Sequence, residues 1–84
     1  MESIAKLIAE LGQKTESTRF SRLLKICESV FGSPRISGSH HIFKTPWPGD
    51  PRINLQTVQG NAKSYQVKQV IQALKKYQSQ EEEQ

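Results

Sequence analysis

The sequence predicts one small α+β domain in which a three-stranded antiparallel sheet is backed by helices. Apolar residues recur at helical spacing up to residue 31 and again after residue 64. Between them, short segments alternate apolar and polar residues, as half-buried strands do. The chain has 84 residues, of which 35% are hydrophobic, so only a single modest core is expected. The expected order of elements is α-α-β-β-β-α.

The first two helices are predicted from two apolar stripes. Ile4, Leu7, Ile8 and Leu11 form the first stripe, with Gly12 as a C-cap. The second stripe consists of Phe20, Leu23, Leu24, Cys27 and either Val30 or Phe31. Ser17 or Thr18 is the expected N-cap of this second helix, and Gly32 ends it.

Three strands are predicted in the middle of the chain. Residues 35–37 form a short edge strand, because Pro34 precedes them, and Gly38-Ser39 form a turn. Residues 40–45 form the second strand. The segment 46–51 contains three prolines and one glycine and is expected to be a stiff loop. Residues 52–56 form the third strand.

A final helix is predicted from Ser64, which can act as its cap. Its apolar stripe consists of Val67, Val70, Ile71, Leu74 and Tyr77. We therefore expect a single domain over residues 1–77, of which 1–18 form an N-terminal helical extension. Residues 78–84 are expected to be an acidic, disordered tail.

The charge distribution favours a polyanionic partner. Residues 1–80 carry all 12 basic residues and five of the eight acidic ones, a net charge of +7. No apolar run approaches the ~18 residues of a membrane span, and the N-terminus lacks a secretory pattern, so no membrane partner is expected. The single cysteine, Cys27, forms no internal disulfide and is expected to be a buried helix residue in a cytoplasmic protein.

Both histidines lie where the second strand begins, in the run Gly38-Ser39-His40-His41. Histidine is the residue type whose unperturbed charge change falls near neutral pH. In a regular strand His40 and His41 point to opposite faces, so only one of them is expected to meet a given phosphate. Two consecutive histidines without cysteines or clustered carboxylates lack the usual ligand set of a metal site, so no metal is expected.

From Phe20 to Tyr77 the chain resembles the HicA-type toxins, the small mRNA interferases of toxin–antitoxin pairs. The residues that carry the resemblance are Arg35, Gly38-Ser39-His40 and Phe43, within the α-β-β-β-α order. The resemblance implies a fold like the double-stranded-RNA-binding domain, endonuclease cleavage of mRNA, and a catalytic His40. It also implies a cognate HicB-type antitoxin.

The chemistry of RNA cleavage fits this assignment. RNA carries its own nucleophile, the 2′-hydroxyl, so a histidine base or acid can act without metal or cofactor. Candidate RNA contacts are Arg35, Gly38, Ser39, His41, Lys44, Arg52 and Lys63. For the basic residues, ordinary solvated charges are an equal alternative.

Other interpretations stay open at this point. A non-catalytic RNA-binding module would have the same basic surface, and a protein-interaction domain would use Trp47 and the N-terminal helix. Trp47 can stack a base, enter a partner's groove, or cover the small core, and the last is favoured. The helix over residues 1–18 offers a surface for packing or for a homo-oligomer.

Overall fold

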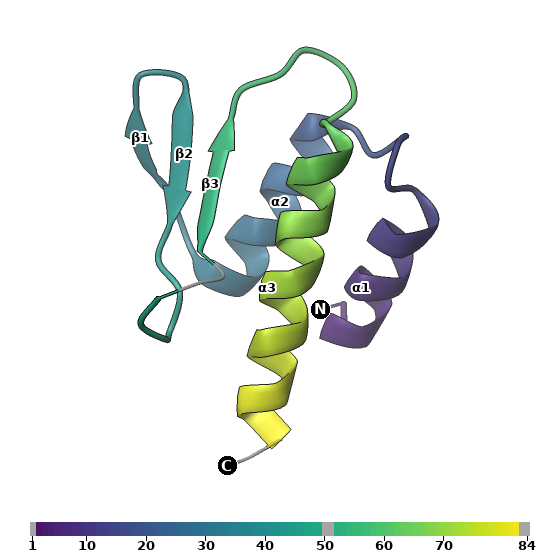
Figure 1. Ribbon diagram of the computed structural model, residues 1–84, viewed down its shortest axis with the longest axis vertical. Helices are drawn as coiled ribbons and strands as arrows, with labels where there is room; N and C mark the ends of the chain where they lie inside the picture. Colours follow the sequence, from purple (N-terminus) through teal and green to yellow (C-terminus); the bar gives the residue numbers. More distant parts are fainter. Residues whose placement is uncertain (1, 50–51, 83–84) are drawn as a thin grey trace.

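The computed structural model describes residues 2–49 and 52–82 (Figure 1). Two helices come first, α1 (Ile4–Gln13) and α2 (Phe20–Phe31). Three strands follow, β1 (Arg35–Ser37), β2 (His40–Phe43) and β3 (Ile53–Gln56). The helix α3 (Ser64–Glu82) comes last. The predicted α+β class and the order α-α-β-β-β-α are confirmed.

The sheet is antiparallel with strand order β1-β2-β3. Figure 1 shows the sheet and α1 on opposite sides of the α2–α3 layer. Contacts between elements agree, because α2 packs on β2, α3 packs on β3, and α1 packs against α3. One face of the sheet is therefore covered by helices, and the other carries no helix among the described residues.

The core lies between the sheet and the helices and extends beneath α1. Leu23, Ile53, Leu55 and Val70 are fully buried at its centre. Leu7 and Leu11 of α1 join the same core, with Ile4 and Ile8 packed at its margin. The apolar stripe of α1 is thus used for packing within the chain, and a homo-oligomer through this helix would have to use its other face.

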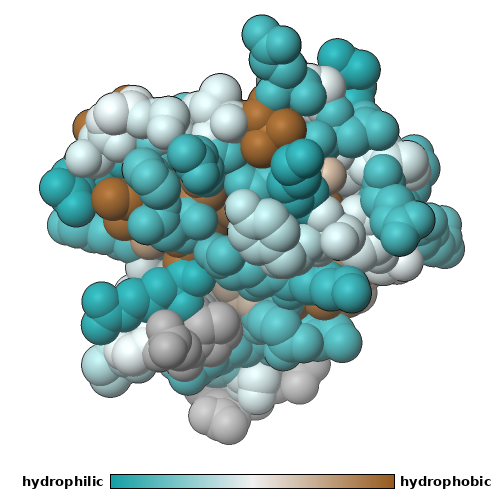
Figure 2. All heavy atoms as spheres, turned by 45° about the horizontal axis from the view of Figure 1, so that its top comes forward, coloured by the Kyte–Doolittle hydropathy of each residue, from teal (hydrophilic) through white to brown (hydrophobic). Residues whose placement is uncertain are grey.

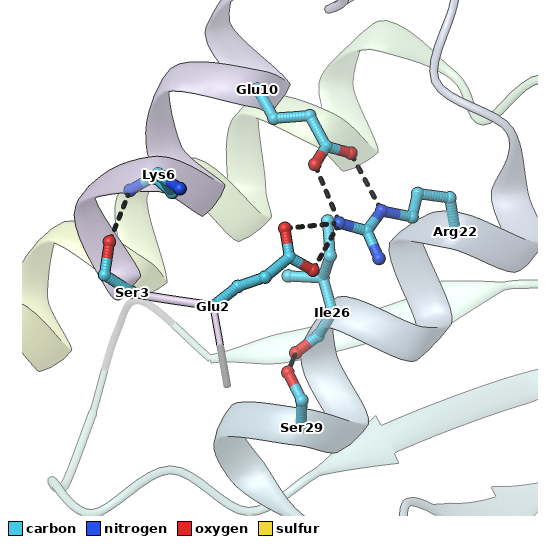
Figure 3. A network of polar contacts seen from close by, with 7 residues as sticks. All are labelled: Glu2, Ser3, Lys6, Glu10, Arg22, Ile26 and Ser29. Atoms are coloured by element: carbon cyan, nitrogen blue, oxygen red, sulfur yellow. Dashed lines mark hydrogen bonds and ion pairs between the residues drawn. The ribbon is translucent and has the colours of Figure 1, made fainter.

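A guanidinium also ties α1 to α2 (Figure 3). Arg22 donates from Nε and Nη2 to the two carboxylate oxygens of Glu10, at 2.8 and 2.7 Å. Its Nη2 also lies 2.8 Å from Oε1 of Glu2. These hydrogen bonds lower the pKa of the Glu10 carboxyl below its ordinary value, against the opposing effect of burial. They also raise the pKa of Arg22, which keeps its charge.

Gly32 is the C-cap of α2, as predicted, but the other predicted caps of the first two helices are wrong. α1 continues one residue past Gly12. The N-cap of α2 is Arg19, without a side-chain cap, whereas the Thr18 hydroxyl donates to the Lys14 carbonyl at 2.7 Å. The N–H of Phe20 instead donates to the carbonyl of Gly60 at 2.9 Å. At the start of α2, a backbone carbonyl from a distant loop therefore takes the place of the neighbouring capping side chain that the sequence predicts.

The expected disordered tail is also wrong as far as Glu82, because α3 continues to that residue. Glutamine and glutamate are good helix formers, and a side-chain hydrogen bond between Tyr77 and Glu81, one helical turn apart, raises the pKa of Tyr77. Residues 83–84 lie outside the described part.

The second strand ends at Phe43 rather than residue 45, and the third begins at Ile53 rather than residue 52.

Residues 50–51 of the predicted stiff loop also lie outside the described part. Among the described helices, none is both long and apolar enough to cross a bilayer.

Candidate nucleic-acid interface

The turn before the histidines is a tight two-residue hairpin between β1 and β2. Gly38 has φ +60°, and no residue other than glycine has positive φ in the described chain. A positive φ at the first of two turn residues is the pattern of a type II′ turn, which strongly favours glycine there. Gly38-Ser39 therefore set the register in which Ser37 pairs with His40.

The two histidines point to opposite faces of β2, as strand alternation predicts. His41 is half-buried on the helix-covered face, where its ring meets Phe20 of α2 edge-on at a centroid distance of 5.8 Å. His40 is exposed on the other face. Only His40 can therefore reach a ligand that lies on the open face of the sheet.

Strand pairing arranges the open face in rows. Cross-strand partners share a face, so the first row holds Ser37, His40 and Gln56, and the second holds Arg35, Ile42 and Asn54. Lys44 and Arg52 flank the next position, just beyond the strand ends. Successive rows are two residues apart, or about 7 Å. The imidazole and the three cations thus share one face within the span of a short oligonucleotide.

A hollow of about 510 Å³ lies among these cations. Arg35, Lys44 and Arg52 line it, together with Ile42, Trp47 and Asn54. Sequence analysis named the three cations as separate candidates, and the fold brings them to one place. Positive charge from three sides makes this hollow suited to an anionic group.

The exposed imidazole of His40 has a defined partner. Its Nδ1 lies 3.0 Å from Oδ1 of Asn54, on the neighbouring strand. The backbone N–H of Asn54 in turn donates to Oε1 of Gln69 in α3 at 2.9 Å. Sequence reasoning missed both amides, although the alternation of residues 52–56 already places Asn54 on the polar face.

His41 belongs to a different set of contacts. Its Nε2 lies 3.0 Å from the hydroxyl oxygen of Thr57. That hydroxyl donates to the carbonyl of Ser39 at 3.0 Å, and the Thr57 N–H donates to the same carbonyl at 2.8 Å. These bonds fix the turn that precedes His40. The structure therefore gives His41 a place in the turn and its packing, and does not group it with the three cations.

Of the remaining candidates, Lys63 lies outside the cationic hollow, whereas Trp47 is among the residues that line it. Lys63 immediately precedes α3, and its N–H is bonded by Oε1 of Gln66 at 3.0 Å. Trp47 is only 8% exposed and meets Phe31 edge-on, with the Lys76 ammonium 5.3 Å from its ring centroid. The indole covers the core, which confirms the favoured interpretation of this residue.

Figure 2 shows hydrophilic side chains over most of the face that it presents, with hydrophobic atoms in small separate patches. Ile36 of β1, 57% exposed, and Tyr65, 61% exposed, are the exposed large hydrophobic residues among those described. Scattered single residues of this kind do not form a large apolar interface.

Comparisons with known proteins give no match: no family model, no curated protein and no solved structure is similar to this chain. The motif residues and the geometry of the open sheet face are therefore the features from which a function can be proposed.

Proposed function

We propose that this chain is a metal-independent endoribonuclease of the HicA type, with a fold like the double-stranded-RNA-binding domain. In this proposal it acts as the toxin of a toxin–antitoxin pair on mRNA in the cytoplasm. The observation that carries the proposal is the placement of His40. Its imidazole is exposed on an open sheet face, held by Asn54, and shares that face with three cations.

The proposed reaction is an internal transesterification. His40 takes the proton of a 2′-hydroxyl, whose oxygen attacks the adjacent phosphorus, or protonates the 5′-oxygen as its bond to phosphorus breaks. The balanced products are a 2′,3′-cyclic phosphate and a 5′-hydroxyl. General acid–base help of this kind is typically worth ~10²–10⁴-fold. Arg35, Lys44 and Arg52 would offset the phosphate charge next to the scissile bond.

Cleavage is tested with purified protein and RNA in buffer that contains EDTA. We expect the native chain to produce fragments that end in a cyclic phosphate. The His40→Ala chain is expected to lose at least ~10²-fold in rate. Lys6→Gln, on the far helix α1, is the matched background variant and should cleave normally. Equal cleavage by native and His40→Ala chains would contradict the catalytic role of His40.

A growth assay tests the toxin role separately. Expression of the native chain without an antitoxin should arrest growth, and expression of His40→Ala to the same level should not. Equal toxicity of the two chains would contradict the proposal. RNA that is bound but stays intact with the native protein would favour a non-catalytic RNA-binding module instead.

The proposed antitoxin covers the open sheet face. Its surface there is acidic, because it must meet Arg35, Lys44 and Arg52. The outer edge of β1 is also free of any strand in the described sheet, and its three residues are all exposed. Such an edge can accept an added strand from a partner. Tests with a protein from the neighbouring reading frame should give a complex in which the native chain no longer cleaves RNA.

A further inference from the structure

We propose that Asn54 is a positioning residue for His40. Its side-chain carbonyl holds the imidazole in the tautomer that carries the proton on Nδ1. The lone pair of Nε2 is then directed away from β2 and β3, toward a ligand on the open face. The functional consequence rests on the proposed role of His40. The tautomer itself is a property of the free protein and can be measured without RNA.

The geometry of one hydrogen bond fixes the assignment. Nδ1 of His40 and Oδ1 of Asn54 are 3.0 Å apart, which is within the normal range for an N–H···O bond. An amide oxygen only accepts, so the proton of this bond must lie on Nδ1. In a neutral ring the other nitrogen, Nε2, is then an acceptor with a free lone pair. A general base needs such a lone pair at its exposed nitrogen.

Asn54 is itself braced from two sides. On one side, Asn54 pairs with Ile42 of β2 in the sheet. On the opposite side of β3, its backbone N–H donates to Oε1 of Gln69 at 2.9 Å. The backbone that carries the orienting amide is thereby anchored to both the sheet and α3. A residue supported in this way can hold its neighbour's ring in one orientation.

His41 supplies an internal comparison, because its contacts require the opposite tautomer. The Thr57 hydroxyl donates to the carbonyl of Ser39 at 3.0 Å, so its own proton is already committed. Nε2 of His41, 3.0 Å from that hydroxyl oxygen, must therefore donate. Two adjacent histidines of one strand are thus expected to carry their protons on different nitrogens.

Nitrogen-15 NMR of the ring nitrogens tests this directly. The spectra are recorded on the free, uniformly labelled chain in alkaline buffer. We expect a protonated Nδ1 in His40 and a protonated Nε2 in His41. Asn54→Leu should give His40 a mixture of tautomers, whereas Asn54→Asp, which keeps an acceptor oxygen, should retain the Nδ1–H form. Gln56→Leu, opposite His40 on the same face, is the control and should leave the tautomer unchanged.

A protonated Nε2 in His40 of the native chain would overturn the proposal, and so would an unchanged tautomer in Asn54→Leu. Because this measurement needs no cleavage, it decides the role of Asn54 as an orienting group even if the native chain leaves RNA intact, in which case only the proposed function fails.

Kinetics provide the second readout. We expect Asn54→Leu to lower kcat about three- to tenfold, because this is the change in rate that corresponds to the free energy of one typical hydrogen bond. KM should stay unchanged, because Asn54 orients the base and the cations bind the phosphates. A raised KM with unchanged kcat would mean that Asn54 binds RNA directly, and would overturn the positioning role.

Discussion

His40 and His41 are neighbours in the chain, yet the pleat of β2 places them in different environments. One ring is exposed beside Asn54, and the other packs against Phe20. The alternation of a strand is enough to separate them, since successive side chains point to opposite faces. The proposed function depends on this choice of face, because only the exposed ring can meet a bulky polyanion.

Cys27 illustrates how burial controls the reactivity of a single residue. It is fully buried in α2, and desolvation raises the pKa of its thiol to about 12. The reactive form is the thiolate, so the native chain should react with a thiol reagent at under about a hundredth of the rate of the chain in denaturant. Reaction with an aromatic disulfide reagent, followed by absorbance with and without urea, measures this. Rapid labelling of the native chain would contradict the burial of Cys27.

At the scale of the element, α1 is a structural part of the domain and not an appended extension. Leu7 is 2% exposed and Leu11 is fully buried, and both belong to the core that also holds α3. Arg22 adds an ionic link between α1 and α2. Removing α1 would therefore expose apolar surface of α3, so we do not expect residues 20–77 to be stable alone.

Leu11→Ala tests this role of α1. Truncation of a fully buried leucine leaves a cavity and is expected to cost about 2–5 kcal/mol of unfolding free energy. Lys6→Ala, at an exposed position of the same helix, should change stability by less than about 0.5 kcal/mol. Urea titration with fluorescence of Trp47 measures both. Similar small effects from the two substitutions would mean that α1 is not packed in the core.

The link between Glu10 and Arg22 predicts a pH dependence. The pKa of Glu10 is lowered in the folded chain, so the ionised carboxyl stabilises the fold above its unfolded pKa of about 4.3. This contribution is lost as the pH falls through the lower, folded value. Glu10→Gln should thus be less stable than the native chain near pH 7, by up to about 1 kcal/mol for a partly exposed pair. Urea titrations over a series of acidic pH values should show the difference disappearing, whereas a constant difference would contradict this account.

Two glutamines of α3 protect the outer edge of β3. Gln66 is 1% exposed and donates from Nε2 to the carbonyl of Gln56 at 2.8 Å, and Gln69 accepts from the N–H of Asn54. These bonds satisfy edge groups of the strand that would otherwise be open to another chain. Sequence reasoning did not identify this role, because a polar residue beside an apolar helix stripe is normally solvated.

Gln66→Ala should therefore destabilise the fold more than its polarity suggests. It leaves the Gln56 carbonyl and the Lys63 N–H without their partner, which we expect to cost about 1–3 kcal/mol. Gln72→Ala, at an exposed position of the same helix, serves as the control and should be close to neutral. Thermal unfolding followed by circular dichroism compares them, and equal melting temperatures would contradict the edge-protecting role.

At the scale of the whole molecule, the excess of basic residues becomes a localised feature. Of the cations, Arg22 is engaged by Glu2 and Glu10, whereas Arg35, Lys44 and Arg52 line the hollow on the open sheet face. The helices occupy the other face, so the proposed RNA substrate would meet these three cations from the open side. Net charge predicts a polyanionic partner, and the fold decides which surface receives it.

The salt dependence of RNA binding measures this arrangement. For single-stranded RNA, log K falls with log salt at a slope of about −0.7 for each phosphate neutralised. Changing Arg35, Lys44 and Arg52 to Gln together should therefore reduce the slope by about 2. The measurement uses fluorescence anisotropy of a labelled oligonucleotide with the His40→Ala chain, which prevents cleavage. Lys6→Gln in the same background should leave the slope unchanged, and an equal change in both would show that the charge acts without a defined site.

Local sequence patterns were sufficient to predict the class, the order of the six elements, the hairpin turn at Gly38 and the separation of the two histidines. These follow from short-range rules, because periodicity, turn residues and strand alternation act within a few residues of one another. The same rules failed at the N-cap of α2, where Gly60 supplies the partner, and at the end of α3.

Long-range packing was needed to show that α1 belongs to the core and that Asn54, 14 residues from His40, is the partner of its ring. Both depend on how β3 registers on β2 and how α3 packs behind them. That register follows from core packing across the sheet, which is not encoded in a local pattern.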